Sequence, residues 1–215
     1  MRLLSVVRRI SLTVLAALVA PLAPACAQQP QPDRRIGDEG PLTYFVAEGL
    51  ASSGVREGDR ELARWALEAW AALVSPALEL RPGPEATATV RVYWAGPDAG
   101  LYGEMRARQV DGRPAADVFV HPDTDALGLD IARAARADPL FREAIVYLTC
   151  VHELGHAFGL GHTDDFADIM YSFVYGGDFV AYFMRFRSQL TTRDDIPRAS
   201  PFSTGDVEAF RALHR

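Results

Sequence analysis

The 215-residue sequence has no lysine, only two cysteines, and no long apolar run after residue 27. All 22 basic residues are arginines, which we interpret as genome composition bias without functional meaning. A membrane-spanning helix needs about 20 apolar residues, so we expect no membrane span after residue 27. The chain is 49% hydrophobic and long enough to bury its own core, which predicts one globular domain with short terminal segments.

The N-terminal residues have the composition of an export signal. A basic start precedes an apolar run over residues 10–20, and small residues follow. We therefore predict a signal peptide over residues 1–27, with an uncleaved N-terminal anchor as the alternative. The pair Arg8 and Arg9 leaves twin-arginine export open beside the general route, and Cys26 leaves a lipid anchor open. The expected location is periplasmic or extracellular.

Cleavage after residue 27 would leave a single cysteine and an acidic chain. Cys150 would then have no partner, which excludes an intrachain disulfide, and we interpret it as a buried apolar residue. The signal carries three arginines and no acid, so 19 basic and 28 acidic side chains remain, a net charge of −9. This charge argues against nucleic acid or anionic lipid as a partner. We expect a monomer.

The rest of the chain divides into a short linker and one domain. Residues 28–40 are rich in Gln, Pro, Asp and Gly, which predicts a linker or short pro-segment before a domain over residues 41–215. Apolar spacing and capping residues predict three helices, over residues 57–73, 139–159 and 204–213. Alternating or β-branched runs predict strands within residues 43–46, 86–95 and 116–121. Residues 96–114 are predicted to be a loop, and 121–130 a turn.

The segment from His152 to His162, HELGHAFGLGH, carries the chemistry. Residues four apart share one face of a helix, so His152 and His156 can point at one ion. Gly159 can adopt a left-handed conformation that ends the helix, after which His162 supplies a third nitrogen. Three protein ligands leave the fourth tetrahedral position for water, as in catalytic zinc sites.

Glu153 is the candidate general base in this segment. It follows the first histidine, so its carboxylate can reach water beside the metal, accept a proton and pass it to the leaving amine. Zinc would lower the pKa of that water to roughly 7 and polarise the carbonyl under attack. The sequence therefore predicts an exported zinc-dependent endopeptidase with one catalytic Zn²⁺ and a protein or peptide substrate.

The histidine segment and the Asp168-Ile-Met170-Tyr that follows resemble the metzincin clan, and within it the matrixins. A looser likeness covers most of residues 41–215. The resemblance implies an α+β fold with a twisted mixed sheet, long helices and a small C-terminal subdomain after Gly159. It also implies that Met170 lies in a turn beneath the zinc. An extended substrate would lie along an edge strand, which we place at residues 116–120.

The chain departs from the matrixins at two kinds of site. Cys26 lies in the signal, so latency through a pro-segment cysteine is unsupported. Matrixins also hold a second, structural zinc with extra histidines, whereas only His121 and His214 lie outside the motif here, so we expect that site to be absent.

Several acidic residues have two interpretations each. Asp123, Asp125 and Asp130 could ligate Ca²⁺, although we favour a solvated acidic turn. Asp164 and Asp165 follow the third histidine and could orient the ligands, or could be surface acids.

Residues 171–192 form an insertion after the methionine turn. Four aromatic residues recur there at helical spacing: Phe179, Tyr182, Phe183 and Phe186. We favour a helix packed on the lower subdomain, and the same side chains could also line the cleft beside the zinc. Two other functions stay open for the chain: a zinc-retaining binding protein without turnover, which the presence of Glu153 disfavours, and an exported adhesin with incidental histidines.

Overall fold

The computed structural model of the protein describes residues 35–37, 40–74, 78–96 and 102–214. The predicted signal peptide and most of the predicted linker lie outside these residues. So do Ser75 and Pro76, which follow the first predicted helix and whose proline predicts its end. Among the residues described, no helix combines the length and apolar character that a bilayer crossing requires.

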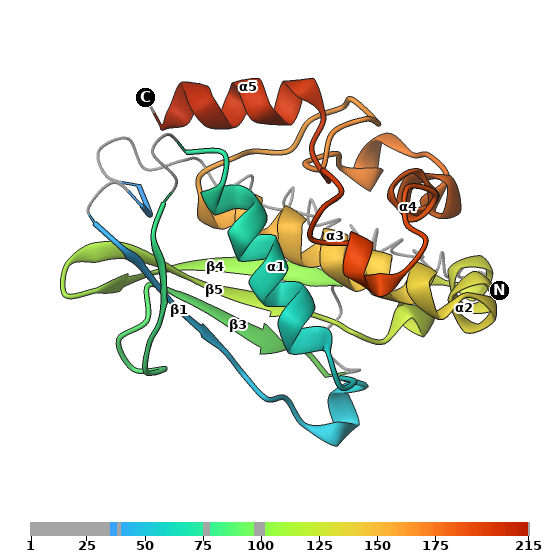
Figure 1. The fold of residues 1–215 in the computed structure, drawn as a ribbon, viewed down its shortest axis with the longest axis horizontal. Helices are drawn as coiled ribbons and strands as arrows, with labels where there is room; N and C mark the ends of the chain where they lie inside the picture. The colour runs from blue at the N-terminus through green and yellow to red at the C-terminus, as the bar shows by residue number, and fades with distance from the viewer. Residues whose placement is uncertain (1–34, 38–39, 75–77, 97–101, 215) are drawn as a thin grey trace, which may run out of the picture.

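A five-stranded mixed sheet forms one layer of the domain, in the order β2-β1-β3-β5-β4 (Figure 1). The parallel strands are β1 (Leu42–Val46), β2 (Leu80–Pro82), β3 (Val90–Trp94) and β5 (Arg113–Val120). The remaining strand, β4 (Gly103–Val110), is antiparallel to β5 and lies at the edge. The prediction that residues 116–120 form the edge strand is therefore wrong, because β5 pairs on both sides.

The prediction of a loop over residues 96–114 is also wrong, because this segment contains all of β4. This strand, GEMRARQV, has exposed or half-buried side chains on both faces, so apolar alternation does not reveal it. The hairpin turn does leave a signal. Asp111 and Gly112 have φ values of 50° and 74°, the left-handed conformations that favour Asp-Gly in tight β-hairpins.

One face of the sheet is buried and the other is solvent-accessible. Six side chains of β3 and β5 form the buried face: Val90, Val92, Trp94, Ala116, Val118 and Val120. On the other face Arg91 pairs with Asp117 at 2.6 Å. Because only one face is covered, α1 (Asp59–Ala71) and α3 (Pro139–Ala157) must both pack on that side.

The two long helices confirm the predictions for residues 57–73 and 139–159 to within two residues at each end. Trp70 of α1 donates its indole N–H to the Val151 carbonyl of α3 at 2.8 Å, which joins the helices. Asp138 accepts hydrogen bonds from the backbone N–H groups of Leu140 and Phe141, and thus caps α3. A short helix that was not predicted, α2 (Leu129–Ala137), precedes it after the 3-10 turn η2 (Thr124–Leu127).

The C-terminal subdomain begins after Gly159 and packs against α3 on the side away from the sheet (Figure 1). It contains η3 (Phe173–Tyr175), α4 (Phe179–Arg187), η4 (Arg193–Asp195) and α5 (Thr204–Leu213). The predicted last helix is confirmed, and Ser203 caps it. The helix expected in the insertion is α4. Its Phe186 ring stacks on Tyr147 of α3, with ring centroids 5.3 Å apart.

Candidate zinc site and substrate pocket

The end of α3 brings three imidazoles together. His152 and His156 lie one turn apart, and Gly159, with φ 97°, reverses the chain so that His162 returns toward them. The Nε2 atom of His162 lies 3.3 Å from that of His152 and 3.1 Å from that of His156. Two nitrogens bound to one tetrahedral zinc at 2.0–2.1 Å are about 3.3 Å apart, so the three side chains fit this ion.

Backbone carbonyls fix the orientation of two of these rings. Nδ1 of His152 donates to the Ile169 carbonyl at 2.7 Å, and Nδ1 of His156 donates to the Leu160 carbonyl at 2.8 Å. Since a carbonyl only accepts, the proton lies on Nδ1 and the Nε2 lone pair faces the common point. Burial and the neighbouring His156 lower the pKa of His152 to about 3, so its ring is neutral near pH 7, as a ligand must be.

Asp164 and Asp165 do not orient the rings of His152 and His156, because the backbone carbonyls of Ile169 and Leu160 do so. Asp165 accepts a hydrogen bond from the Ala167 N–H at 2.8 Å and thus shapes its own loop. Asp164 is exposed. The surface interpretation of both residues is the better one. The carbonyl partners could not be found from the sequence, because every residue carries a carbonyl.

Met170, which the resemblance places beneath the zinc, packs against α3 at Gly155. Its side chain is 1% exposed and packs so closely on α3 that a Cβ built on Gly155 would lie 2.4 Å from the methionine sulfur. Gly155 lies between the two helical histidines, so only a glycine lets the methionine approach. Asp206 of α5 accepts hydrogen bonds from the N–H groups of Ile169, at 2.8 Å, and Met170, at 3.4 Å. The sequence did not predict this contact.

Glu153 lies beside the histidines in a buried position against the first residue of β4. A Cβ built on Gly103 would lie 2.4 Å from the Glu153 Oε1 atom, so any larger residue there would displace the Glu153 carboxyl group. Burial, and to a lesser extent the charge of Glu104, raise the pKa of the Glu153 carboxyl to about 8. A cation held by the histidines would lower this pKa again. The carboxyl group is thus placed to exchange a proton near neutral pH.

An apolar pocket of about 240 Å³ opens beside these residues. His152, Glu153 and His162 form one side, and the rest is mainly hydrophobic: Leu127, Leu148, Phe173, Phe179, Tyr182 and Phe183. Both interpretations of the insertion therefore apply, since Tyr182 of α4 contacts Phe166 and Tyr171 of the lower subdomain and α4 also lines the cleft. Pockets that enclose whole small ligands usually measure about 300–1,000 Å³, so this volume suits a single side chain.

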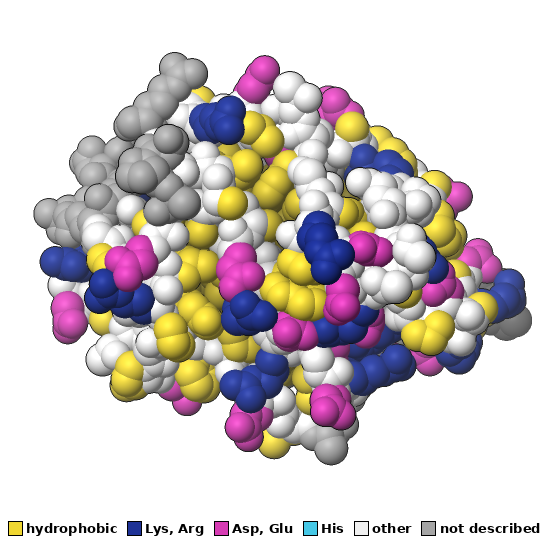
Figure 2. All heavy atoms as spheres, viewed as in Figure 1, with side chains coloured by type: hydrophobic (Ala, Val, Ile, Leu, Met, Phe, Trp, Pro, Cys, Tyr) yellow, Lys and Arg dark blue, Asp and Glu magenta, His cyan; other side chains and the backbone are white. Residues whose placement is uncertain are grey.

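Acidic and basic side chains are mixed on the face of the molecule that carries α1 and α5 (Figure 2). No histidine is visible among the described residues on this face. The candidate zinc site therefore opens elsewhere.

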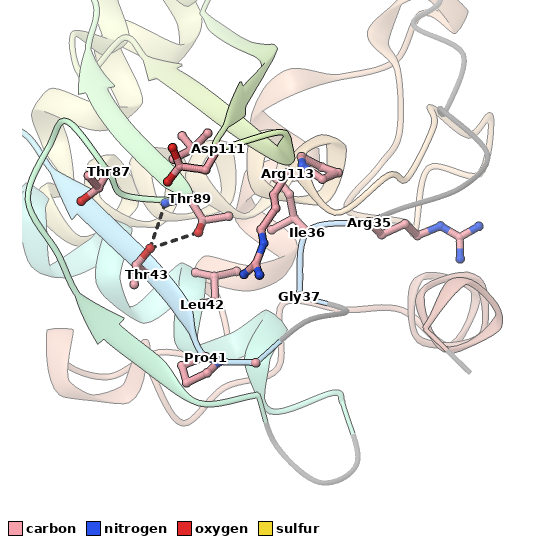
Figure 3. Close-up of a pocket in the computed structure, with 13 residues that line it drawn as sticks. Arg35, Ile36, Gly37, Pro41, Leu42, Thr43, Thr87, Thr89, Asp111 and Arg113 are labelled. Atoms are coloured by element: carbon pink, nitrogen blue, oxygen red, sulfur yellow. Dashed lines mark hydrogen bonds between the residues drawn. The ribbon is translucent and has the colours of Figure 1, made fainter.

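A larger pocket of about 490 Å³ lies at the other end of the β4–β5 hairpin (Figure 3). There Thr43 Oγ1 accepts a hydrogen bond from the Thr89 N–H at 3.0 Å. The two pockets share no lining residue.

The three acids considered as calcium ligands do not form a calcium site. Asp123 caps η2, Asp125 pairs with Arg136 at 2.8 Å, and Asp130 points toward Arg133. Within the described parts of the chain, the residues that converge as metal ligands are the three histidines. Calcium binding is thus unsupported. Cys150 is fully buried, as predicted, and burial raises the pKa of its thiol.

The sheet, the helix with its two histidines, and the methionine turn define a metzincin-like zinc metallopeptidase. A comparison with protein families identifies the family within this class. The matrixin family matches residues 39–180, about two thirds of the chain, and the protein belongs to this family. Among solved structures, archaemetzincin from Methanopyrus kandleri matches with 15% identity, over 82% of this chain and 96% of that one, at a TM-score of 0.41. No curated protein sequence matches.

Proposed function

We propose that the protein is an exported zinc endopeptidase in which His152, His156 and His162 hold the metal and Glu153 is the general base. The observation that carries this proposal is the convergence of three Nε2 atoms beside a buried carboxyl group. When bound, zinc supplies Lewis acidity toward water and a peptide carbonyl. Glu153 takes the proton from the attacking water and delivers it to the leaving amine.

The substrate would bind as an extended strand along β4. This strand pairs with β5 on one side only, so its other edge offers backbone N–H and C=O groups to a peptide. Gly103, at its start, lies against Glu153, which would bring the scissile bond to the metal. A substrate side chain beside that bond would enter the apolar pocket. We therefore expect cleavage next to an apolar residue.

The test is cleavage of a mixed peptide library by residues 28–215 loaded with zinc. The Glu153→Gln variant keeps the shape of the carboxyl group but cannot accept the proton, so it should bind one zinc per chain and lose cleavage. Glu208→Ala removes an exposed carboxylate of α5 and serves as the control. Full activity of Glu153→Gln would exclude the general base. Zinc binding by an inactive wild type would favour a binding protein without turnover.

Export is a separate part of the proposal and rests on the composition of residues 1–27. N-terminal sequencing of the protein recovered from cell fractions tests it. A mature N-terminus near residue 28 in the periplasm or medium supports export, and an intact N-terminus in the cytoplasm contradicts it.

A further inference from the structure

The carbonyl that orients His152 has a second partner in the insertion helix. The Tyr182 hydroxyl of α4 lies 3.1 Å from the Ile169 carbonyl oxygen and 3.0 Å from that of Asp168. The same Ile169 oxygen accepts the hydrogen bond from His152 Nδ1 at 2.7 Å. A zinc-ligand candidate and a pocket residue thus meet at one oxygen atom.

The methionine turn is held from both sides at this point. Asp206 accepts from its N–H groups, whereas Tyr182 donates to its carbonyls. The Tyr182 side chain is 4% exposed, and burial raises the pKa of its phenol, so the hydroxyl keeps its proton and acts as a donor. This buried donor is shared between the two carbonyls and so restricts where the carbonyl of Ile169 points.

The Tyr182 ring is itself held in place. It contacts the rings of Phe173 and Phe183 edge to face, at centroid distances of 5.0 and 5.2 Å, and the Arg185 guanidinium lies 4.5 Å above it. These contacts restrict the ring without help from the hydroxyl. Removal of the hydroxyl alone should therefore leave the wall of the pocket in place.

We propose that Tyr182 is a positioning residue, whose hydroxyl fixes the carbonyl that holds His152 in its metal-binding orientation. The proposal rests on the zinc site proposed above. Tyr182 lies beyond residues 39–180, so the family match does not include it. Partners that orient a ligand in this way commonly contribute 10–100-fold to metal affinity or activity.

The test compares Tyr182→Phe with Tyr171→Phe. Tyr171 lines the same pocket and is also buried, but its hydroxyl donates to the Gly176 carbonyl at 2.8 Å, which is not a carbonyl that holds His152 or His156. Zinc affinity is measured by competition with a chromophoric chelator. We expect the zinc Kd to rise about tenfold in Tyr182→Phe and to stay unchanged in Tyr171→Phe. The visible spectrum of the Co²⁺-loaded protein should change only in Tyr182→Phe.

A second measurement distinguishes weaker zinc binding from a general loss of stability. For each variant, the stabilisation by saturating zinc is measured against its own metal-free form. A tenfold weaker Kd reduces that stabilisation by about 1.4 kcal/mol in Tyr182→Phe. Equal zinc affinity and equal stabilisation in both variants would overturn the positioning role. Absence of cleavage by the wild type would instead count against the proposed function, since the zinc measurements do not depend on turnover.

Discussion

Replacement of Asp206 by alanine should destabilise the methionine turn, which it contacts directly from α5. The carboxylate is 2% exposed and accepts hydrogen bonds from three backbone N–H groups: Ile169 at 2.8 Å, Met170 at 3.4 Å and Ser203 at 2.8 Å. The first two belong to the buried methionine turn. Alanine removes the acceptor, and water cannot easily replace it there.

The size of the effect follows from burial. A buried donor left without a partner costs about 1–3 kcal/mol, and the long bond to Met170 contributes less than the short one to Ile169. Loss of the helix cap adds about 1 kcal/mol. A total of about 3 kcal/mol corresponds to a fall in Tm of about 6–12 °C for a domain of this size.

Asp195→Ala is the matched control. Asp195 caps η4 by the same pattern, accepting from the N–H groups of Thr191 and Thr192, but its side chain is 30% exposed. Water can solvate those N–H groups after the substitution, so we expect a fall of only about 2–4 °C. Differential scanning calorimetry of both zinc-loaded variants provides the comparison. Equal losses in the two variants would refute the argument from burial.

Three further predictions concern the site and the metal helix. Gly103→Ala should lower kcat/KM about 100-fold with the fold intact, because the new Cβ displaces Glu153, while Gly96→Ala, which meets open space, should be neutral. Chelation of zinc should lower the Tm, because the metal ties α3 to the loop behind it; an unchanged Tm would contradict this coupling. Burial acts to raise the pKa of Asp138, but Arg187 and the first-turn N–H groups of α3 hold it below 3.8. Relative to Asp138→Asn, the wild type should be about 1 kcal/mol more stable above pH 4 in urea titrations and should lose this advantage as the pH falls further.

Local signals predicted the two long helices and the strands β1, β3 and β5, but they missed β2, β4 and α2. The helix over residues 139–157 carries its own start signal, Asp138 before Pro139, and its own stop signal, Gly159. Strand β4 has no such pattern, because an edge strand exposed on both faces needs no apolar alternation. Whether β5 is at the edge depends on its pairing with β4, which follows from the fold and not from the residues of β5.

The same distinction between local signals and long-range packing applies to the candidate site. Helical spacing was enough to bring His152 and His156 together, because they lie in one element. The partners of the turn are distant in sequence: Asp206 is 37 residues from Ile169, and Tyr182 is 13. No periodicity relates such positions, so packing alone brings them to one peptide.

The residues that support the candidate ligands show what the C-terminal subdomain contributes. The peptide over residues 168–170 receives a carboxylate from α5, a hydroxyl from α4 and an imidazole N–H from α3. Each of these groups fixes a backbone atom that a loop alone would leave free to move. Metal-ligand geometry must hold to within a few tenths of an ångström, which requires rigid support around the ligands. The two C-terminal helices contact this turn, and α4 also lines the pocket, so one element contacts both the turn beside the candidate ligands and the candidate substrate pocket.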